Sequence, residues 1–176
     1  MNVVEILANG KEIDDMNINI EPAYENKNDI KELFLEYTKM LVEHDPTVAD
    51  YLQVQNYDSE LEHLEDKYGL PKGRLYLAKM GDEVAGCIAL RRLDDMKGEI
   101  KRLYVRPEFR GNKIAHELVE KIIEEAKIIG YQSVFLDTLP FLKEAIHLYQ
   151  KHGFYQIESY NDSPMTTAIY MRLDLV

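Results

Sequence analysis

The chain has 176 residues, of which 45% are hydrophobic and 30% are charged. A chain of this length fits one domain that buries about 70% of its unfolded surface. The hydrophobic fraction excludes wholesale disorder, and no apolar run approaches the roughly 18 residues of a membrane span. The N-terminus lacks the basic segment of a secretory signal peptide. The single cysteine, Cys87, excludes an internal disulfide framework and a Cys-rich zinc site. We therefore expect a cytoplasmic protein with no membrane partner.

The formal net charge is −11, which disfavours a nucleic-acid partner. Residues 97–113 are an exception, because six Lys or Arg residues stand there against two Glu residues. The six cations are Lys97, Lys101, Arg102, Arg106, Arg110 and Lys113. This local excess of positive charge predicts a binding site for a small anion.

In the first half of the chain, residues 1–15 are expected to form a separate N-terminal arm, and residues 16–176 a single domain. The apolar alternation of 18–20 predicts a strand. A helix follows, capped by Asn28 and ended by Asp45-Pro46. The sequence Ser59-Glu60-Leu61-Glu62 is typical of a capping box and predicts a second helix that closes at Gly69.

The second half of the chain alternates between extended and helical patterns. Gly81-Asp82 is a hairpin signal between two strands. The apolar spacing of 114–130 predicts a long amphipathic helix that ends at Gly130. The expected strands are 75–80, 84–93, 99–105, 133–137, 154–157 and 169–175, and the other expected helix is 142–152. This order predicts an α/β (α+β) domain with a mixed sheet of about seven strands and helices on both faces.

The loop before the 114–130 helix carries charges of an unusual sign. A helix N-terminus has a partial positive charge and favours Asp or Glu, but Arg106, Arg110 and Lys113 stand here. Free backbone N–H groups together with these cations would form a phosphate site. The alternative is that the side chains simply project into solvent.

The segment from Leu103 to Ala115, LYVRPEFRGNKIA, resembles motif A of the GNAT superfamily of N-acetyltransferases. The resemblance implies a mostly antiparallel sheet and a loop whose N–H groups hold the pyrophosphate of acetyl-coenzyme A. The cofactor-binding residues that it implies are Leu103, Tyr104, Val105, Arg110, Gly111, Asn112, Lys113, Ile114, Ala115 and His116. Lys113 stands where the family usually has glycine. We expect it to adopt helical dihedrals and to weaken or reshape binding.

A second segment, AIHLYQKHGF over residues 145–154, resembles the family's later helix motif. The resemblance implies transfer of an acetyl group to a primary amine by direct attack in a ternary complex. Tyr149 would then protonate the departing thiolate, and Glu99 would act as the base. The tetrahedral oxyanion would be held by N–H groups of Leu103–Val105. Tyr149 could instead be a core residue, and Glu99 a solvated glutamate at a strand end.

Several further assignments rest on the residues alone or on the family pattern. Tyr51–Tyr57 and Phe141 are expected near a small-molecule or peptide amine acceptor. His116 and His147 are expected to be structural or solvated, although His116 could touch the cofactor. No His-x-x-x-His pattern appears, so we expect no metal. The resemblance allows a homodimer. It also leaves open a non-catalytic sensor that binds acyl-coenzyme A.

Overall fold

The computed structural model describes residues 17–176, so the expected arm of residues 1–15 lies outside the described residues. The strands are β1 Ile18–Pro22, β2 Arg74–Met80, β3 Glu83–Arg92, β4 Lys97–Val105, β5 Ser133–Thr138, β6 Tyr155–Ile157 and β7 Ile169–Asp174. The helices are α1 Lys27–His44, α2 Val48–Val54, α3 Tyr57–Glu62, α4 Leu64–Tyr68, α5 Ile114–Ile129 and α6 Lys143–Lys151, with the 3₁₀ turn η1 Pro107–Phe109. None of these helices is long and apolar enough to cross a membrane.

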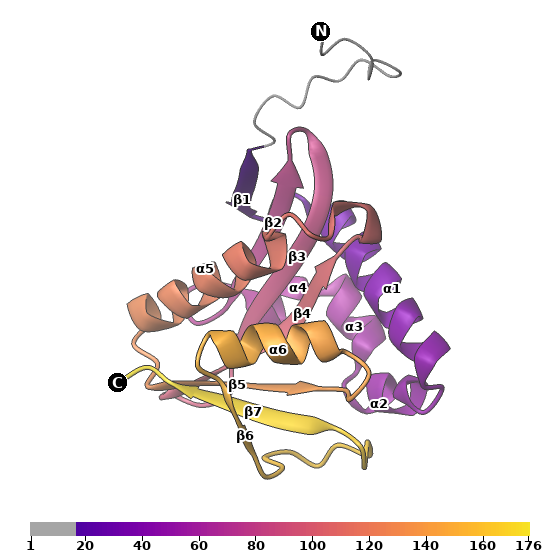
Figure 1. Ribbon diagram of the computed structural model, residues 1–176, viewed down its shortest axis with the longest axis vertical. Helices are drawn as coiled ribbons and strands as arrows, with labels where there is room; N and C mark the ends of the chain where they lie inside the picture. The colour runs from indigo at the N-terminus through magenta and orange to yellow at the C-terminus, as the bar shows by residue number, and fades with distance from the viewer. Residues whose placement is uncertain (1–16) are drawn as a thin grey trace, which may run out of the picture.

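The seven strands form one sheet in the order β1-β2-β3-β4-β5-β7-β6. Every neighbouring pair is antiparallel except β4 and β5. That parallel pair aligns only from Lys97 opposite Ser133 to Glu99 opposite Phe135. Beyond this point the two strands diverge, and β5 runs at a steep angle to β4 (Figure 1). The predicted fold class is confirmed, and the divergence opens a wedge within the sheet.

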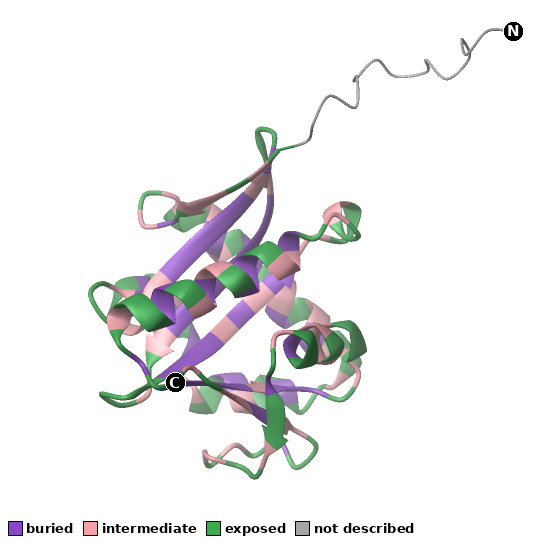
Figure 2. Ribbon diagram, turned by 60° about the vertical axis from the view of Figure 1, so that its left-hand side comes forward, coloured by how far each residue is buried: buried purple, intermediate pink, exposed green. Residues whose placement is uncertain are grey.

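Helices cover both faces of the sheet and produce two hydrophobic cores. The apolar side of α5 packs over β2, β3 and β4, while its outer side is exposed (Figure 2). Helices α1 to α4 cover the opposite face with a second core that includes Phe34 and Tyr68. The predicted periodicity of α5 is confirmed, because Ile114, Leu118 and Ile122 are all buried.

The region between α1 and β2 differs from the prediction. Three short helices stand there, and the expected capping box is wrong, because Ser59 and Glu60 lie inside α3. The α1 helix begins after Asn26 rather than at Asn28. Glu60 is only 2% exposed and binds Arg102 of β4 through two hydrogen bonds of 2.9 and 3.0 Å. Glu60 therefore serves a buried ion pair with β4, a role that the local pattern did not indicate.

Glu60 is surrounded by donors. Besides Arg102, the Tyr68 hydroxyl donates to it at 2.6 Å, and the Lys67 ammonium lies 2.9 Å away. Burial by itself would raise the pKa of Glu60, but the charge and hydrogen bonds of Arg102 and the Tyr68 hydrogen bond outweigh it and lower the pKa to about 2. The carboxylate therefore stabilises the fold when it is ionised.

Glu60→Gln is expected to destabilise the protein at pH 7 by about 3–5 kcal/mol, because Arg102 would lose its buried counter-ion. The depressed pKa means that the carboxylate's stabilisation is fully present above about pH 4.5 and is lost as the pH falls toward 2. Urea unfolding at pH 7 and at a series of lower pH values measures both effects, and the variant should show a flatter acid dependence. Glu62→Gln is the matched control, since the Glu62 side chain is 71% exposed. Equal losses in the two variants would contradict the assignment.

Candidate active site

The wedge between β4 and β5 holds a cavity of about 960 Å³. Helices α1 and α2 line one side, and α6 and the end of β5 line the other. Nine of the ten residues predicted to bind the cofactor line it, namely Leu103, Tyr104, Val105, Arg110, Gly111, Lys113, Ile114, Ala115 and His116. Asn112 does not line it, because its side-chain amide donates to the Phe109 carbonyl at 3.0 Å. Asn112 therefore helps to fix the loop conformation but is not part of the cavity wall.

The cavity floor is the free edge of β4. Pairing with β5 stops at Glu99, so the backbone from Ile100 to Val105 has no strand partner on that side. A bulge accompanies this break: the register against β3 shifts between Cys87 and Ala89, and Arg102 has a φ of 58°. Backbone groups on an unpaired edge inside a cleft need a partner. A bound ligand, or the oxyanion of a tetrahedral intermediate, would supply one.

The loop before α5 presents unneutralised positive charge. The α5 N-terminus has no side-chain cap, and its first internal hydrogen bond runs from the Glu117 N–H to the Lys113 carbonyl at 3.0 Å. Arg110 is exposed and donates to the Val105 carbonyl at 3.1 Å. Within residues 17–176, neither Arg110 nor Lys113 forms an ion pair. Uncapped N–H groups beside two free cations fit a bound pyrophosphate.

The other four cations of 97–113 serve the fold. Each lies against a carboxylate: Lys97 against Asp94 at 3.2 Å, Lys101 against Asp137 at 3.5 Å, Arg102 against Glu60 at 2.9 Å and Arg106 against Glu36 at 2.8 Å. The expectation that Arg106 contributes to the anion site is therefore wrong, because it ties the loop to α1. The local positive charge is concentrated at one end of the cavity.

Tyr149 of α6 lines the cavity and is 6% exposed. Its ring packs against Phe154 with the centroids 5.6 Å apart. Burial, reinforced by Tyr37 and Asp137, raises the pKa of its hydroxyl well above the usual value. Tyr149 is therefore protonated at neutral pH, and the raised pKa makes its hydroxyl a weaker acid than that of an exposed tyrosine. The structure shows that it belongs to both the core and the cavity wall.

Glu99 does not line the cavity. It is fully buried, pairs with the Arg91 guanidinium, and accepts a hydrogen bond of 2.8 Å from the Tyr160 hydroxyl. The expectation of a solvated strand-end glutamate is wrong. Lys101 connects Glu99 to the cavity, because its ammonium lies 3.6 Å from Glu99 and 3.5 Å from Asp137.

Asp137, at the end of β5, is the cavity-lining carboxylate that the sequence reasoning missed. Tyr51 donates a short hydrogen bond to it, and the side-chain amide of Asn161 donates another at 3.3 Å. Burial would raise the pKa of Asp137, but the Lys101 charge and these hydrogen bonds outweigh it and lower the pKa. The carboxylate is therefore ionised at neutral pH. A charged residue near the end of a mostly buried strand is the sequence feature that could have indicated this site.

The other residues considered in the sequence analysis lie in the cavity wall, in the core or on the surface. Tyr51 and Phe141 line the cavity, and the Phe141 ring stacks on His44 with the centroids 4.5 Å apart. Cys87 is buried, and its thiol donates to the Arg102 carbonyl at 3.3 Å. Burial raises the pKa of that thiol, so it is not a nucleophile at neutral pH. His147 is exposed on α6.

Comparisons with known proteins agree with this geometry. The model of the acetyltransferase (GNAT) family matches residues 29–154. An uncharacterized N-acetyltransferase of Schizosaccharomyces pombe is 40% identical over 137 residues, which cover 73% of this chain and 84% of that protein. This chain belongs to the GNAT family, and it is an acyltransferase.

Solved structures show the same fold. A GNAT-family acetyltransferase from Staphylococcus aureus superposes with a TM-score of 0.72 at 22% identity, covering 91% of this chain and 100% of that one. A GNAT acetyltransferase from Elizabethkingia anophelis, solved with acetyl-CoA bound, gives a TM-score of 0.53 at 26% identity over 64% of this chain and 82% of that one. The second structure shows that a GNAT fold similar to this one holds acetyl-CoA.

The backbone at Lys113 shows why glycine is the usual residue of the GNAT pattern at this position. Lys113 is the N-cap of α5, with a φ of 63° and a ψ of 11°, so its backbone is left-handed. The expectation that Lys113 adopts helical dihedrals is therefore wrong, because its backbone lies in the left-handed region, which glycine adopts without strain. The preceding Gly111 also has a positive φ, of 84°. This loop therefore carries backbone strain that a glycine at position 113 would relieve.

Lys113→Gly is expected to be more stable than Lys113→Ala by about 1 kcal/mol, because both remove the charge but only glycine relieves the left-handed strain. Thermal unfolding of the two variants without ligand measures the difference. Gly81→Ala, at the left-handed turn position between β2 and β3, gives the reference cost of the opposite change. Equal melting temperatures for Lys113→Gly and Lys113→Ala would show that the position is not strained.

Proposed function

We propose that the protein transfers the acetyl group of acetyl-coenzyme A to a primary amine by direct attack in a ternary complex. One observation carries the proposal: a single cavity joins the cationic loop at Arg110 and Lys113 to Tyr149 and Asp137. The bound acetyl-CoA of the Elizabethkingia anophelis relative supports the choice of acyl donor. Acetyl-coenzyme A, when bound, supplies an acyl group activated as a thioester.

Two parts of the chain would bind different parts of acetyl-coenzyme A. Arg110, Lys113 and the uncapped N–H groups at the start of α5 would hold the pyrophosphate. The unpaired edge of β4 from Leu103 to Val105 would orient the rest of the donor and stabilise the oxyanion. Donors fixed in a buried cleft favour the developing charge without a further cost of reorganisation.

The acceptor would enter from the side lined by α1 and α2. The ionised Asp137 attracts a protonated amine, and Tyr51 and Lys101 hold that carboxylate in place. Because its pKa is lowered, Asp137 is a weak proton acceptor. The amine's proton would therefore leave to solvent water. Lys101 lies between Glu99 and the cavity, and its protonated ammonium has no lone pair to accept that proton, so the base role that the resemblance implied for Glu99 has no direct route. We propose a small-molecule or peptide amine as the acceptor and the cytoplasm as the location.

The acceptor proposal leads to a direct experiment. A panel of amines is mixed with acetyl-coenzyme A, and the release of free thiol is followed. At least one cationic amine should release thiol well above the rate without enzyme. The rival function is a sensor that binds acyl-coenzyme A without turnover, and the buried position of Glu99 is the feature that favours it. Tight binding with no thiol release from any amine would favour the sensor.

Saturating acetyl-coenzyme A is expected to raise the melting temperature, and Arg110→Glu should remove most of that rise by placing a carboxylate against the phosphates. A ligand at 100 times its dissociation constant stabilises by about 2.7 kcal/mol. Lys127→Glu, the same charge change in the last turn of α5, is the control and should keep the rise. No rise in the wild type would end the assignment of the donor site.

Tyr149→Phe is expected to lower kcat by about ten- to a thousandfold, which is near the usual contribution of general acid–base catalysis. The ring remains, so the melting temperature and the affinity for acetyl-coenzyme A should change little. Steady-state kinetics with a productive amine measures the effect. Tyr155→Phe removes an exposed hydroxyl that donates to Asp174 and is the control. Full turnover by Tyr149→Phe would assign the residue to packing alone.

A further inference from the structure

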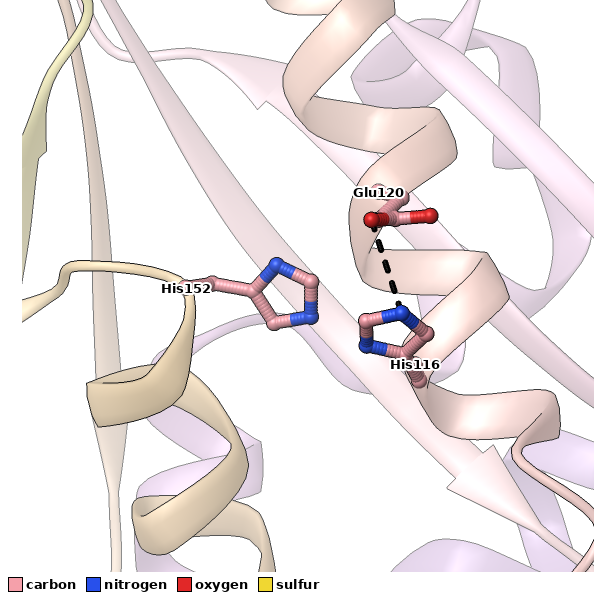
Figure 3. A group of neighbouring side chains, drawn as sticks. All are labelled: His116, Glu120 and His152. Atoms are coloured by element: carbon pink, nitrogen blue, oxygen red, sulfur yellow. Dashed lines mark ion pairs between the residues drawn. The ribbon is translucent and has the colours of Figure 1, made fainter.

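Three potential metal ligands gather where the start of α5 meets the end of α6. His116 and Glu120 lie one turn apart on α5, and His152 follows α6 directly. Their ligand atoms all lie within 4.8 Å of one another. The two imidazole rings face each other with centroids 4.7 Å apart, and Glu120 lies above His116 (Figure 3). The group brings together residues from two elements on either side of the cleft.

One atom of this group has no partner. The Nε2 atom of His152 is buried, and among residues 17–176 it is the one buried side-chain N or O atom without a hydrogen-bond partner. An unsatisfied buried polar atom costs about 1–3 kcal/mol. The pair between His116 Nε2 and Glu120 Oε1, at 3.4 Å, does not account for this atom. Two half-exposed side chains gain little from such a pair.

We propose that His116, Glu120 and His152 bind one divalent transition-metal ion, of which Zn²⁺ best suits the donors. Two imidazole nitrogens and one carboxylate oxygen form a known zinc ligand set that leaves a fourth position for water. Zinc–nitrogen and zinc–oxygen bonds of about 2.0–2.2 Å place tetrahedral ligand atoms roughly 3.3 Å apart. One pair is already at 3.4 Å, so side-chain rotation of His152 would close the site.

The ion would link the two helices that frame the cavity. His116 lines the cavity in the first turn of α5, and His152 lies three residues after Tyr149. A metal bound to both would fix the end of α6 against the start of α5. The initial expectation of no metal rested on the lack of a His-x-x-x-His pattern. This proposal replaces it with a site that forms only in the folded chain.

The test uses the full chain after removal of metal with a chelator. Zn²⁺ alone is titrated in competition with a chromophoric zinc chelator. We expect one ion per chain, and at least a tenfold loss of affinity in His152→Ala and in Glu120→Gln. His147→Ala removes an exposed histidine on α6 and should bind as the wild type does. His152→Gln keeps much of the side-chain volume, and a melting curve in chelator checks that each variant is folded.

Two further readouts separate a built site from adventitious binding. Zn²⁺ at 100 times its dissociation constant should raise the wild-type melting temperature by roughly 5–10 °C, and that of His152→Gln by much less. Co²⁺ should give the visible absorption of a four-coordinate ion in the wild type only. No stoichiometric binding, or equal binding by wild type, His152→Gln and Glu120→Gln, would overturn the proposal. Neither result depends on whether the protein transfers acetyl groups.

Discussion

The early end of the β4–β5 ladder is the constraint on which the rest of the structure depends. Only three residue pairs align these parallel strands, up to Glu99 and Phe135. Past that point the edge of β4 keeps polar backbone groups inside a cleft, where they need a partner. The cavity of about 960 Å³ and the candidate oxyanion donors both follow from this separation. A continuous ladder would satisfy the same groups internally and leave no room for a substrate.

The bulge in β4 that accompanies this separation is held by a buried ion pair. Arg102 has a left-handed backbone conformation. Its guanidinium donates to Glu60 of α3, on the face of the sheet opposite α5. Strained backbone persists only where the surroundings determine it. Because each charge would be costly without the other, the pair fixes the short helices to the strand that forms the cavity floor. Arg102 and Glu60 therefore contribute both to the stability of the fold and to the geometry of the cavity floor.

Charge is distributed along the cavity in a way that suits two unlike substrates. Arg110 and Lys113 supply the positive end, and Asp137 supplies a negative group near α2. In a chain with a net charge of −11, this arrangement would attract a polyanionic donor at one end and a cationic amine at the other. The protonated Tyr149 lies on the α6 wall of the same cavity. In the proposed reaction, binding and proton transfer would be served by residues of separate elements.

The sequence by itself determined the strands and long helices, because the short apolar runs of β2, β3 and β5 and the apolar stripe of α5 are local patterns. Nine of the ten residues predicted to bind the cofactor, and Tyr149 of the later helix motif, line the cavity. Tertiary structure alone decided which charges are neutralised: Glu60 pairs with Arg102, Arg106 pairs with Glu36, and Glu99 is buried against Arg91. The sequence did not indicate that Asp137 lines the cavity or that His152 lies beside His116 and Glu120. In each case the residues that come together are far apart in the chain. Pairing of buried polar groups depends on distances between elements, which local periodicity does not contain.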